Sequence, residues 1–226
     1  MPRVTLISGA SGGLGEAVTQ AFLNNGDIVA GLARNWKRPP ASGAFVAVEA
    51  DLTTAGGCRT AVAEVVARCG RLDVLAHCLG GFAGGQPVAE TADETWNGML
   101  NLNLTAAFHL CRAALPHLIA SGAGRIIAVG SRAALETPAT LSAYNVSKAG
   151  LNALIRTIAA ETKHRGVTAN VVMPSVIDTP ANRAADPSAD FSNWVPPARI
   201  ASLMLWLASD AAADVSGALI PIYGRA

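Results

Sequence analysis

The stretch Ser8-Gly-Ala-Ser-Gly-Gly-Leu-Gly15 lies between an apolar run, Val4 to Ser8, and a segment of helical periodicity that carries Leu14, Val18 and Phe22 on one face. Glycines at such a junction let the backbone turn sharply and let a phosphate approach it, while the helix N-terminus offers free N–H groups. The stretch therefore predicts the first strand–turn–helix unit of a dinucleotide-binding fold. A tight turn without a ligand is the alternative interpretation.

The rest of the chain repeats this alternation of apolar strand and amphipathic helix. The expected strands are continuous apolar runs, as buried parallel strands are, and helices separate them. The sequence predicts an α/β protein with a Rossmann-type, doubly wound parallel sheet of about seven strands and helices on both faces. Nothing divides residues 1–226, so we expect a single domain. We expect strands at 4–8, 28–33, 45–48, 72–79, 125–129, 167–173 and 218–222, and helices at about 14–26, 53–69, 92–120, 142–164 and 197–208.

Composition and charge exclude several classes of function. The 226 residues are 51% hydrophobic and 15% charged, with 17 basic and 16 acidic side chains and a net charge of +1. This balance predicts no nucleic-acid partner and no attachment to an anionic membrane. The N-terminal apolar run is short, and no run approaches the ~20 residues of a membrane span. We expect a cytoplasmic protein.

The four cysteines, Cys58, Cys69, Cys78 and Cys111, have no spacing typical of a metal site. None forms a C-x-x-C pair, and no cluster with histidine has zinc-ligand spacing. The sequence therefore predicts reduced thiols and no metal.

The end of the second expected strand, Leu32-Ala-Arg34, indicates which dinucleotide is bound. An acid at this point binds the ribose 2′-hydroxyl of NAD, whereas a cation suits the 2′-phosphate of NADP. Arg34, with Lys37 or Arg38 as helpers, favours NADP(H) over NAD(H). The alternative is that all three are solvated loop charges.

The glycine spacing Gly9, Gly13, Gly15 resembles the T-G-x-x-x-G-x-G signature of the short-chain dehydrogenase/reductase family, with Ser8 in place of the threonine. Further family motifs follow in order along essentially the whole chain. One departure is His77-Cys-Leu-Gly80, which stands where the family has N-N-A-G. The resemblance implies cofactor contacts at Ser8, Gly9, Ser11, Gly13, Leu14, Gly15, Arg34, Asp51, Leu52, Leu79, Gly80, Tyr144, Lys148, Pro174, Ile177 and Thr179.

A second set of residues matches the family's catalytic group. Ser131 precedes Tyr144 by thirteen residues, Lys148 follows Tyr144 by four, and Asn103 lies on an earlier helix, with Asn101 as its competitor. Spacing i, i+4 places Tyr144 and Lys148 on one helix face. A free tyrosine has a pKa near ~10, and we expect the lysine to lower it, so that Tyr144 can act as general acid and base.

The resemblance also implies roles for the other two residues. Ser131 would hold the substrate oxygen, and Asn103 would position a water that links Lys148 to solvent. The implied reaction is transfer of hydride between the nicotinamide and a carbonyl or alcohol substrate.

The segment from Asp178 to Pro197 is long and irregular, so we expect a substrate lid at about 178–197. Phe191 and Trp194 either cover the substrate or anchor the loop to the core. This segment and the loop Gly80-Gly-Phe-Ala-Gly-Gly85 resemble dihydropteridine reductases, members of the same family, which would make Phe82 a pterin contact.

Three functions follow from these patterns. The first is an NADP(H)-dependent carbonyl reductase or alcohol dehydrogenase. The others are a reductase of quinonoid pterins and a dinucleotide-binding redox sensor without turnover. The resemblance further implies a homodimer or homotetramer in which the helices at about 92–120 and 142–164 pack across a two-fold axis.

Overall fold

The computed structural model describes residues 2–225. Its centre is a sheet of seven parallel strands in the order β3-β2-β1-β4-β5-β6-β7. The chain winds outward from β1 in one direction and from β4 in the other, which confirms the doubly wound, Rossmann-type sheet. The strands are β1 (Val4–Ser8), β2 (Ile28–Ala33), β3 (Phe45–Glu49), β4 (Val74–His77), β5 (Arg125–Val129), β6 (Thr168–Pro174) and β7 (Leu219–Ile222).

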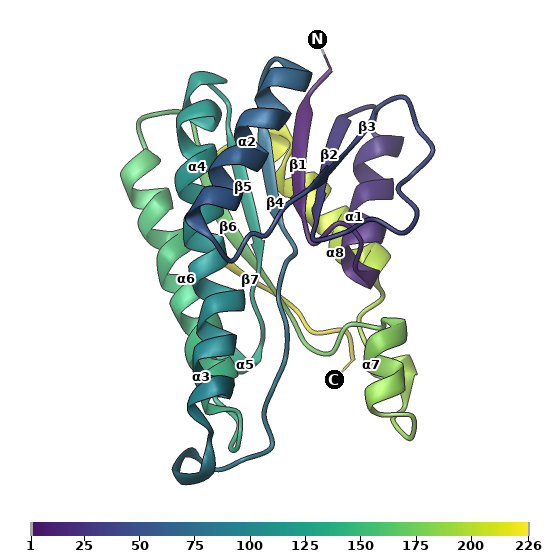
Figure 1. Cartoon of the computed structure of the whole chain (residues 1–226), viewed down its shortest axis with the longest axis vertical. Coiled ribbons are helices and arrows are strands. Elements are labelled where there is room, and N and C mark those ends of the chain that lie inside the picture. Colours follow the sequence, from purple (N-terminus) through teal and green to yellow (C-terminus); the bar gives the residue numbers. More distant parts are fainter. Residues whose placement is uncertain (1, 226) are drawn as a thin grey trace.

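Helices cover both faces of the sheet (Figure 1). On one face lie α1 (Gly13–Asn24) and α8 (Pro197–Leu207), which pack against each other. On the other face lie α2 (Ala55–Cys69), α4 (Ala106–Ala120) and α6 (Ser142–Thr162). Alternate strand residues point to opposite faces, so Leu6 joins the core under α2, α4 and α6, and Ile7 joins the core under α1 and α8.

Shorter helices lie beyond the carboxyl ends of the strands (Figure 1). They are α3 (Asp93–Leu100), α5 (Ala133–Glu136) and α7 (Pro180–Ala185). The expected helix at about 92–120 is interrupted, because Asn101–Thr105 form a π-helical turn between α3 and α4. Neither α5 nor α7 was predicted, because helices of four and six residues are too short to show a hydrophobic periodicity.

Local signals explain several element ends. Gly26 has φ +88 after α1, and the Thr54 side chain caps α2 by accepting from the Gly57 N–H at 3.0 Å. The strand predicted at 72–79 is shorter than expected. At the outer edge of the sheet, β7 contains Pro221, which pairs with Met173 of β6.

Candidate active site

The glycine loop joins β1 to α1 in a turn that side chains would obstruct. Gly9 has φ +67, and its carbonyl oxygen accepts from the Gly12 N–H at 3.0 Å. A Cβ at Gly15 would lie 2.0 Å from the Gly9 oxygen, so the start of α1 meets the loop backbone directly. The free N–H groups of α1 therefore begin at the C-terminal edge of the sheet, where β1 and β4 are neighbours.

A cavity of about 310 Å³ lies beside this loop. Seven predicted cofactor residues line it: Gly9, Ser11, Arg34, Asp51, Leu52, Leu79 and Gly80. The sequence did not identify Gly12, Leu32, Ala33, Asn35, Ala50, Thr53, Cys78 and Leu102, which also line it. Most of these residues are adjacent in sequence to predicted residues, and this adjacency could have identified them as lining the cavity.

The other four predicted residues of the glycine loop lie outside that lining. Ser8 and Leu14 are buried, and Gly15 packs on the loop backbone. Gly13 faces the later segment, since a Cβ there would lie 3.1 Å from the Cβ of Thr179. This contact brings the glycine loop next to Thr179, one of the cofactor contacts predicted after the sixth strand.

Two charged residues, Arg34 and Asp51, line the cofactor cavity. Arg34 is exposed directly after β2, where no acid stands. Asp51 accepts hydrogen bonds from the N–H and the hydroxyl of Thr53, at 3.0 and 2.6 Å. These bonds lower the pKa of Asp51, and the Arg34 charge acts in the same direction.

His77 replaces an asparagine of the family motif and ties two strands together. It is fully buried on β4, and its Nδ1 lies 2.9 Å from the Ser8 Oγ of β1. The same hydroxyl oxygen accepts from the Leu79 N–H at 3.2 Å. Burial lowers the pKa of His77 to about 3, with the Lys148 charge adding to the effect, so the imidazole is neutral. Ser8 therefore joins β1 to the end of β4, inside the sheet.

The residues predicted to be catalytic come from different elements. Tyr144 and Lys148 lie on the first turns of α6, and Ser131 follows β5. The Ser131 side chain lowers the pKa of Tyr144 by hydrogen bonding, so the two side chains are neighbours. Lys148 Nζ reaches the end of β4, because a Cβ at Gly80 would lie 3.1 Å from it. Since Gly80 also lines the cofactor cavity, the group adjoins that cavity.

The ammonium of Lys148 is almost completely enclosed. The residue is 5% exposed, and its Nζ donates to the Val129 carbonyl at 2.9 Å. Burial lowers the pKa of Lys148 to about 8. The lysine can therefore change its protonation state close to neutral pH.

The expectation that Lys148 lowers the pKa of Tyr144 is wrong for this structure. Burial raises the pKa of the half-buried tyrosine, and the hydrogen bond with Ser131 opposes that rise. The physical reason is that the phenolate loses hydration inside the site, while the hydrogen bond of Lys148 goes to Val129.

Asn103 lies in the π-helical turn and is fully buried, whereas its competitor Asn101 is exposed. The Asn103 side chain accepts from the Gly81 N–H at 2.9 Å and donates to the Gly81 carbonyl and the Ser147 hydroxyl at 3.1 and 3.0 Å. It thus fastens the segment after β4 to α6. Turns of this kind are frequent at functional sites, and no sequence signal revealed this one.

The segment predicted as a lid is more ordered than the sequence indicated. Thr179 caps α7 by accepting from the Asn182 N–H at 3.2 Å, and Ile177 forms a bridge with Val195. The rings of Phe191 and Trp194 lie 4.8 Å apart. The Arg183 guanidinium lies 4.7 Å from the centre of the Phe191 ring, so both aromatic residues have partners within the segment.

The remaining predicted residues follow β4 or lie at and after the end of β6. Phe82 is 67% exposed, and its ring meets that of Tyr144 edge to face at 5.0 Å. Pro174 ends β6, and Ile177 and Thr179 follow it. Phe82 is therefore next to the predicted proton donor, while Phe191 and Trp194 pack with each other.

The cysteines are free, and burial raises the pKa of Cys58 to about 11 and those of Cys78 and Cys111 to about 12. Among residues 2–225, no group of three or more His, Cys, Asp and Glu side chains is arranged to hold a metal ion. Over the same range, no helix is both long enough and apolar enough to cross a bilayer.

Known proteins are similar to this chain over most of its length. The family described as short chain dehydrogenase matches residues 3–190. A D-threitol dehydrogenase of Mycolicibacterium smegmatis is 30% identical over 239 residues, which cover 98% of this chain and 92% of that protein. The 3-oxoacyl-(acyl-carrier-protein) reductase MabA of Mycobacterium bovis is 32% identical over 230 residues, with 98% and 92% covered.

Solved structures share the fold as well. A short-chain type dehydrogenase/reductase from Mycobacterium ulcerans superimposes with a TM-score of 0.92 at 26% identity, over 99% of this chain and 89% of that one. Because the family match and these relatives extend over most of its length, the chain belongs to the short-chain dehydrogenase family and is an oxidoreductase that acts on alcohol and carbonyl groups.

Proposed function

We propose that the protein is an NADP(H)-dependent oxidoreductase that interconverts a carbonyl compound and its alcohol, with Tyr144 as general acid and base. The observation that carries the proposal is the meeting of Ser131, Tyr144 and Lys148 beside Gly80, at the wall of the cofactor cavity. A proton donor, a hydrogen-bonding hydroxyl and a buried cation then surround one position for the substrate oxygen.

The residues around the cavity fit a dinucleotide. The turn at Gly9 and Gly15 leaves no Cβ between backbone and phosphate, and the start of α1 supplies N–H groups and partial positive charge. Arg34 supports NADP(H), because it lines the cavity after β2 in a position where NAD sites carry an acid. When bound, the nicotinamide supplies the hydride that reduces the carbonyl carbon.

Side chains of the protein transfer the proton and stabilise the charge that develops on the substrate oxygen. In reduction, Tyr144 gives its hydroxyl proton to the carbonyl oxygen, so hydride and proton together yield the alcohol and the oxidised cofactor. Ser131 donates a hydrogen bond to the same oxygen and stabilises the charge that develops on it. Lys148 places its ammonium beside Gly80 at the wall of the cofactor cavity, and Asn103 holds the Gly81 segment against α6.

The test is a Tyr144→Phe variant, matched with Tyr223→Phe at the only other tyrosine of the chain. We expect Tyr144→Phe to lower kcat about 10²–10⁴-fold, since the ring remains and the proton is lost. Steady-state NADPH consumption measures turnover, and fluorescence titration measures NADPH binding, which should not change. Full turnover in Tyr144→Phe would refute the assigned role.

A reductase of quinonoid pterins is the second candidate, because the exposed Phe82 ring beside Tyr144 offers a surface for a flat aromatic substrate. A screen of carbonyls, alcohols and quinonoid pterins with NADPH, and with NADH in parallel, separates the candidates. Tight NADPH binding without any turnover in that screen would favour the redox sensor.

A further inference from the structure

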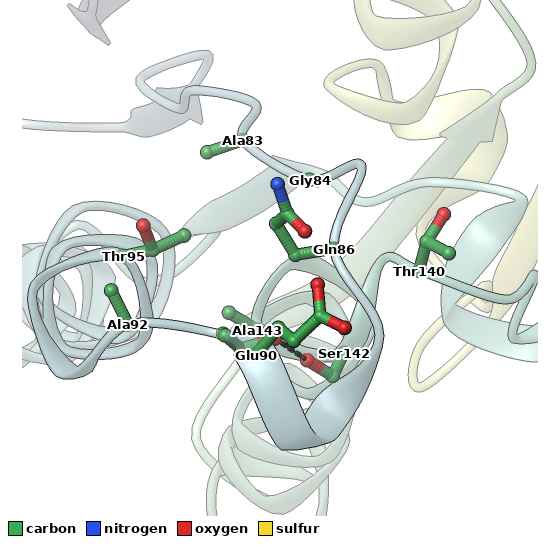
Figure 2. A pocket seen from close by; sticks show the side chains of 10 residues that line it. Ala83, Gly84, Gln86, Glu90, Ala92, Thr95, Thr140, Ser142 and Ala143 are labelled. Carbon is green, nitrogen blue, oxygen red and sulfur yellow. Dashed lines mark hydrogen bonds between the residues drawn. The ribbon is translucent and has the colours of Figure 1, made fainter.

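A second cavity, of about 430 Å³, lies beneath the segment that follows Phe82 (Figure 2). Its lining residues come from the segment 83–95 and from residues 140–143 at the start of α6. None of the ten lining residues belongs to the predicted cofactor or catalytic set. The polar side chains among them are Gln86, Glu90, Thr91, Thr95, Thr140 and Ser142, and the others are alanine or glycine.

Small side chains leave this space open, and three polar side chains around it, two of them exposed, make no hydrogen bond within residues 2–225. Figure 2 shows the Gln86 amide and the Glu90 carboxylate reaching into the space between the loop and the start of α6. Among residues 2–225, no hydrogen-bond partner is found for the side chains of Gln86, Glu90 or Thr95. Polar groups gathered around a hollow in this way suit a polar ligand.

The walls of the cavity are fixed to each other. The Gly85 N–H donates to the Thr140 carbonyl at 2.8 Å, and the hydroxyls of Thr91 and Ser142 lie 3.2 Å apart. Thr140 has φ 62, a left-handed conformation that a β-branched residue adopts only under constraint. Contacts around Thr140 therefore impose the shape of this wall before any ligand arrives.

The lining determines which ligand chemistry fits. Four hydroxyls and an amide can both donate and accept hydrogen bonds. Among the described residues that line the cavity, Glu90 carries the single negative charge and none carries a positive charge. We propose that the cavity is a binding site for a hydroxyl-rich small molecule that is neutral or positively charged.

The cavity also adjoins the proposed active site. Phe82 precedes the wall residue Gly84 by two positions, and Ser142 precedes Tyr144 by two on α6. A ligand that holds both walls also holds the Phe82 ring against Tyr144. This coupling rests on the proposed function, whereas binding itself does not.

Isothermal titration calorimetry tests the binding with three probes of similar size: sorbitol, glucosamine and gluconate. We expect sorbitol and glucosamine to bind the protein without added cofactor, glucosamine more tightly, and gluconate not to bind. Glu90→Gln should weaken glucosamine at least about threefold and leave sorbitol unchanged, because it removes one charge and keeps the shape. The matched control is Glu94→Gln, an exposed acid four residues on that does not line the cavity.

Two results would overturn the binding site: no heat with sorbitol and glucosamine at millimolar concentration, or equal binding of gluconate. Thr95→Leu, which fills the cavity, should abolish binding while the melting temperature stays within a few degrees. Because these measurements involve no turnover, their outcome is independent of the role of Tyr144.

Steady-state kinetics with added glucosamine shows whether the cavity binds part of the substrate or a separate molecule. Competition between glucosamine and the carbonyl substrate would mean that the cavity holds the far end of the substrate. A change in kcat without competition would mean that it holds a separate molecule. Binding with no kinetic change would overturn the coupling to the active site.

Discussion

Lys148 keeps an ammonium in a buried site at the expense of stability. Burial lowers the pKa of Lys148 from 10.5 to about 8. Below pH 8 the lysine is charged in both the folded and the unfolded chain, so the full burial penalty, about 3 kcal/mol, acts on the fold. Between pH 8 and 10.5 the unfolded chain binds more protons, so this group makes stability rise with pH.

We therefore expect Lys148→Met to raise the free energy of unfolding at neutral pH by about 1–2 kcal/mol, less than the full penalty because the Val129 carbonyl loses its donor. The same variant should lose turnover. Urea unfolding at neutral pH and again near pH 10 measures the gain, which should shrink at the higher pH. A variant less stable than the parent at neutral pH would contradict this account.

A substitution at Arg34 tests the preference for NADP(H) over NAD(H). Loss of a charge-assisted bond to the 2′-phosphate should raise the KM for NADPH about 10–100-fold in Arg34→Ala and leave the KM for NADH almost unchanged. Arg59→Ala, at an exposed arginine of α2 outside the cavity lining, serves as the control. Equal effects on both cofactors would remove the basis for an NADP(H) preference.

The close contact between the start of α1 and the glycine loop predicts that a side chain at Gly15 lowers stability. Gly15→Ala places a Cβ 2.0 Å from the Gly9 oxygen and 2.8 Å from the Ala10 Cα, so the loop must open. We expect a loss of about 1–3 kcal/mol in stability and weaker NADPH binding.

Gly56→Ala is the matched control, because a Cβ at Gly56, within the first turn of α2, meets nothing within 4 Å. It should stabilise by about 0.5 kcal/mol through helix propensity alone. Thermal unfolding of both variants measures the contrast. A Gly15→Ala protein as stable as Gly56→Ala would show that the junction is not tight.

Elements marked by local signals were predictable, and those that depend on contacts between distant segments were not. The glycine loop and the apolar strands each follow from adjacent residues. The π-helical turn at Asn101–Thr105 has no such signal, because its Asn103 side chain bonds to Gly81 and Ser147. Spacing likewise placed Tyr144 and Lys148 on one face but said nothing of the burial that raises the pKa of Tyr144.

At the scale of the whole molecule, we propose one domain over residues 1–226 and assembly through its helices. Apolar side chains are exposed on the elements expected at a two-fold axis: Trp96 on α3, Phe108 on α4 and Val146 on α6, at 36%, 43% and 45%. Exposed apolar groups gathered on neighbouring elements are typical of subunit interfaces.

Light scattering should therefore report a dimer or a tetramer. Phe108→Glu should lower the assembly state, because a carboxylate at the contact loses hydration without a partner. Val88→Glu is the control at a valine that is 78% exposed outside these three helices. A monomeric parent protein would contradict the proposal.

Pro221 in β7 affects whether copies of this protein can associate through the edge of the sheet. Pro221 has no N–H group, so the outer strand of the sheet offers an incoming strand one donor fewer than an ordinary edge. A neighbouring copy therefore gains little by continuing the ladder, and open-ended stacking of sheets into fibrils is disfavoured at this edge. In a chain that is 51% hydrophobic, an edge strand with one donor fewer reduces the tendency to aggregate through the sheet.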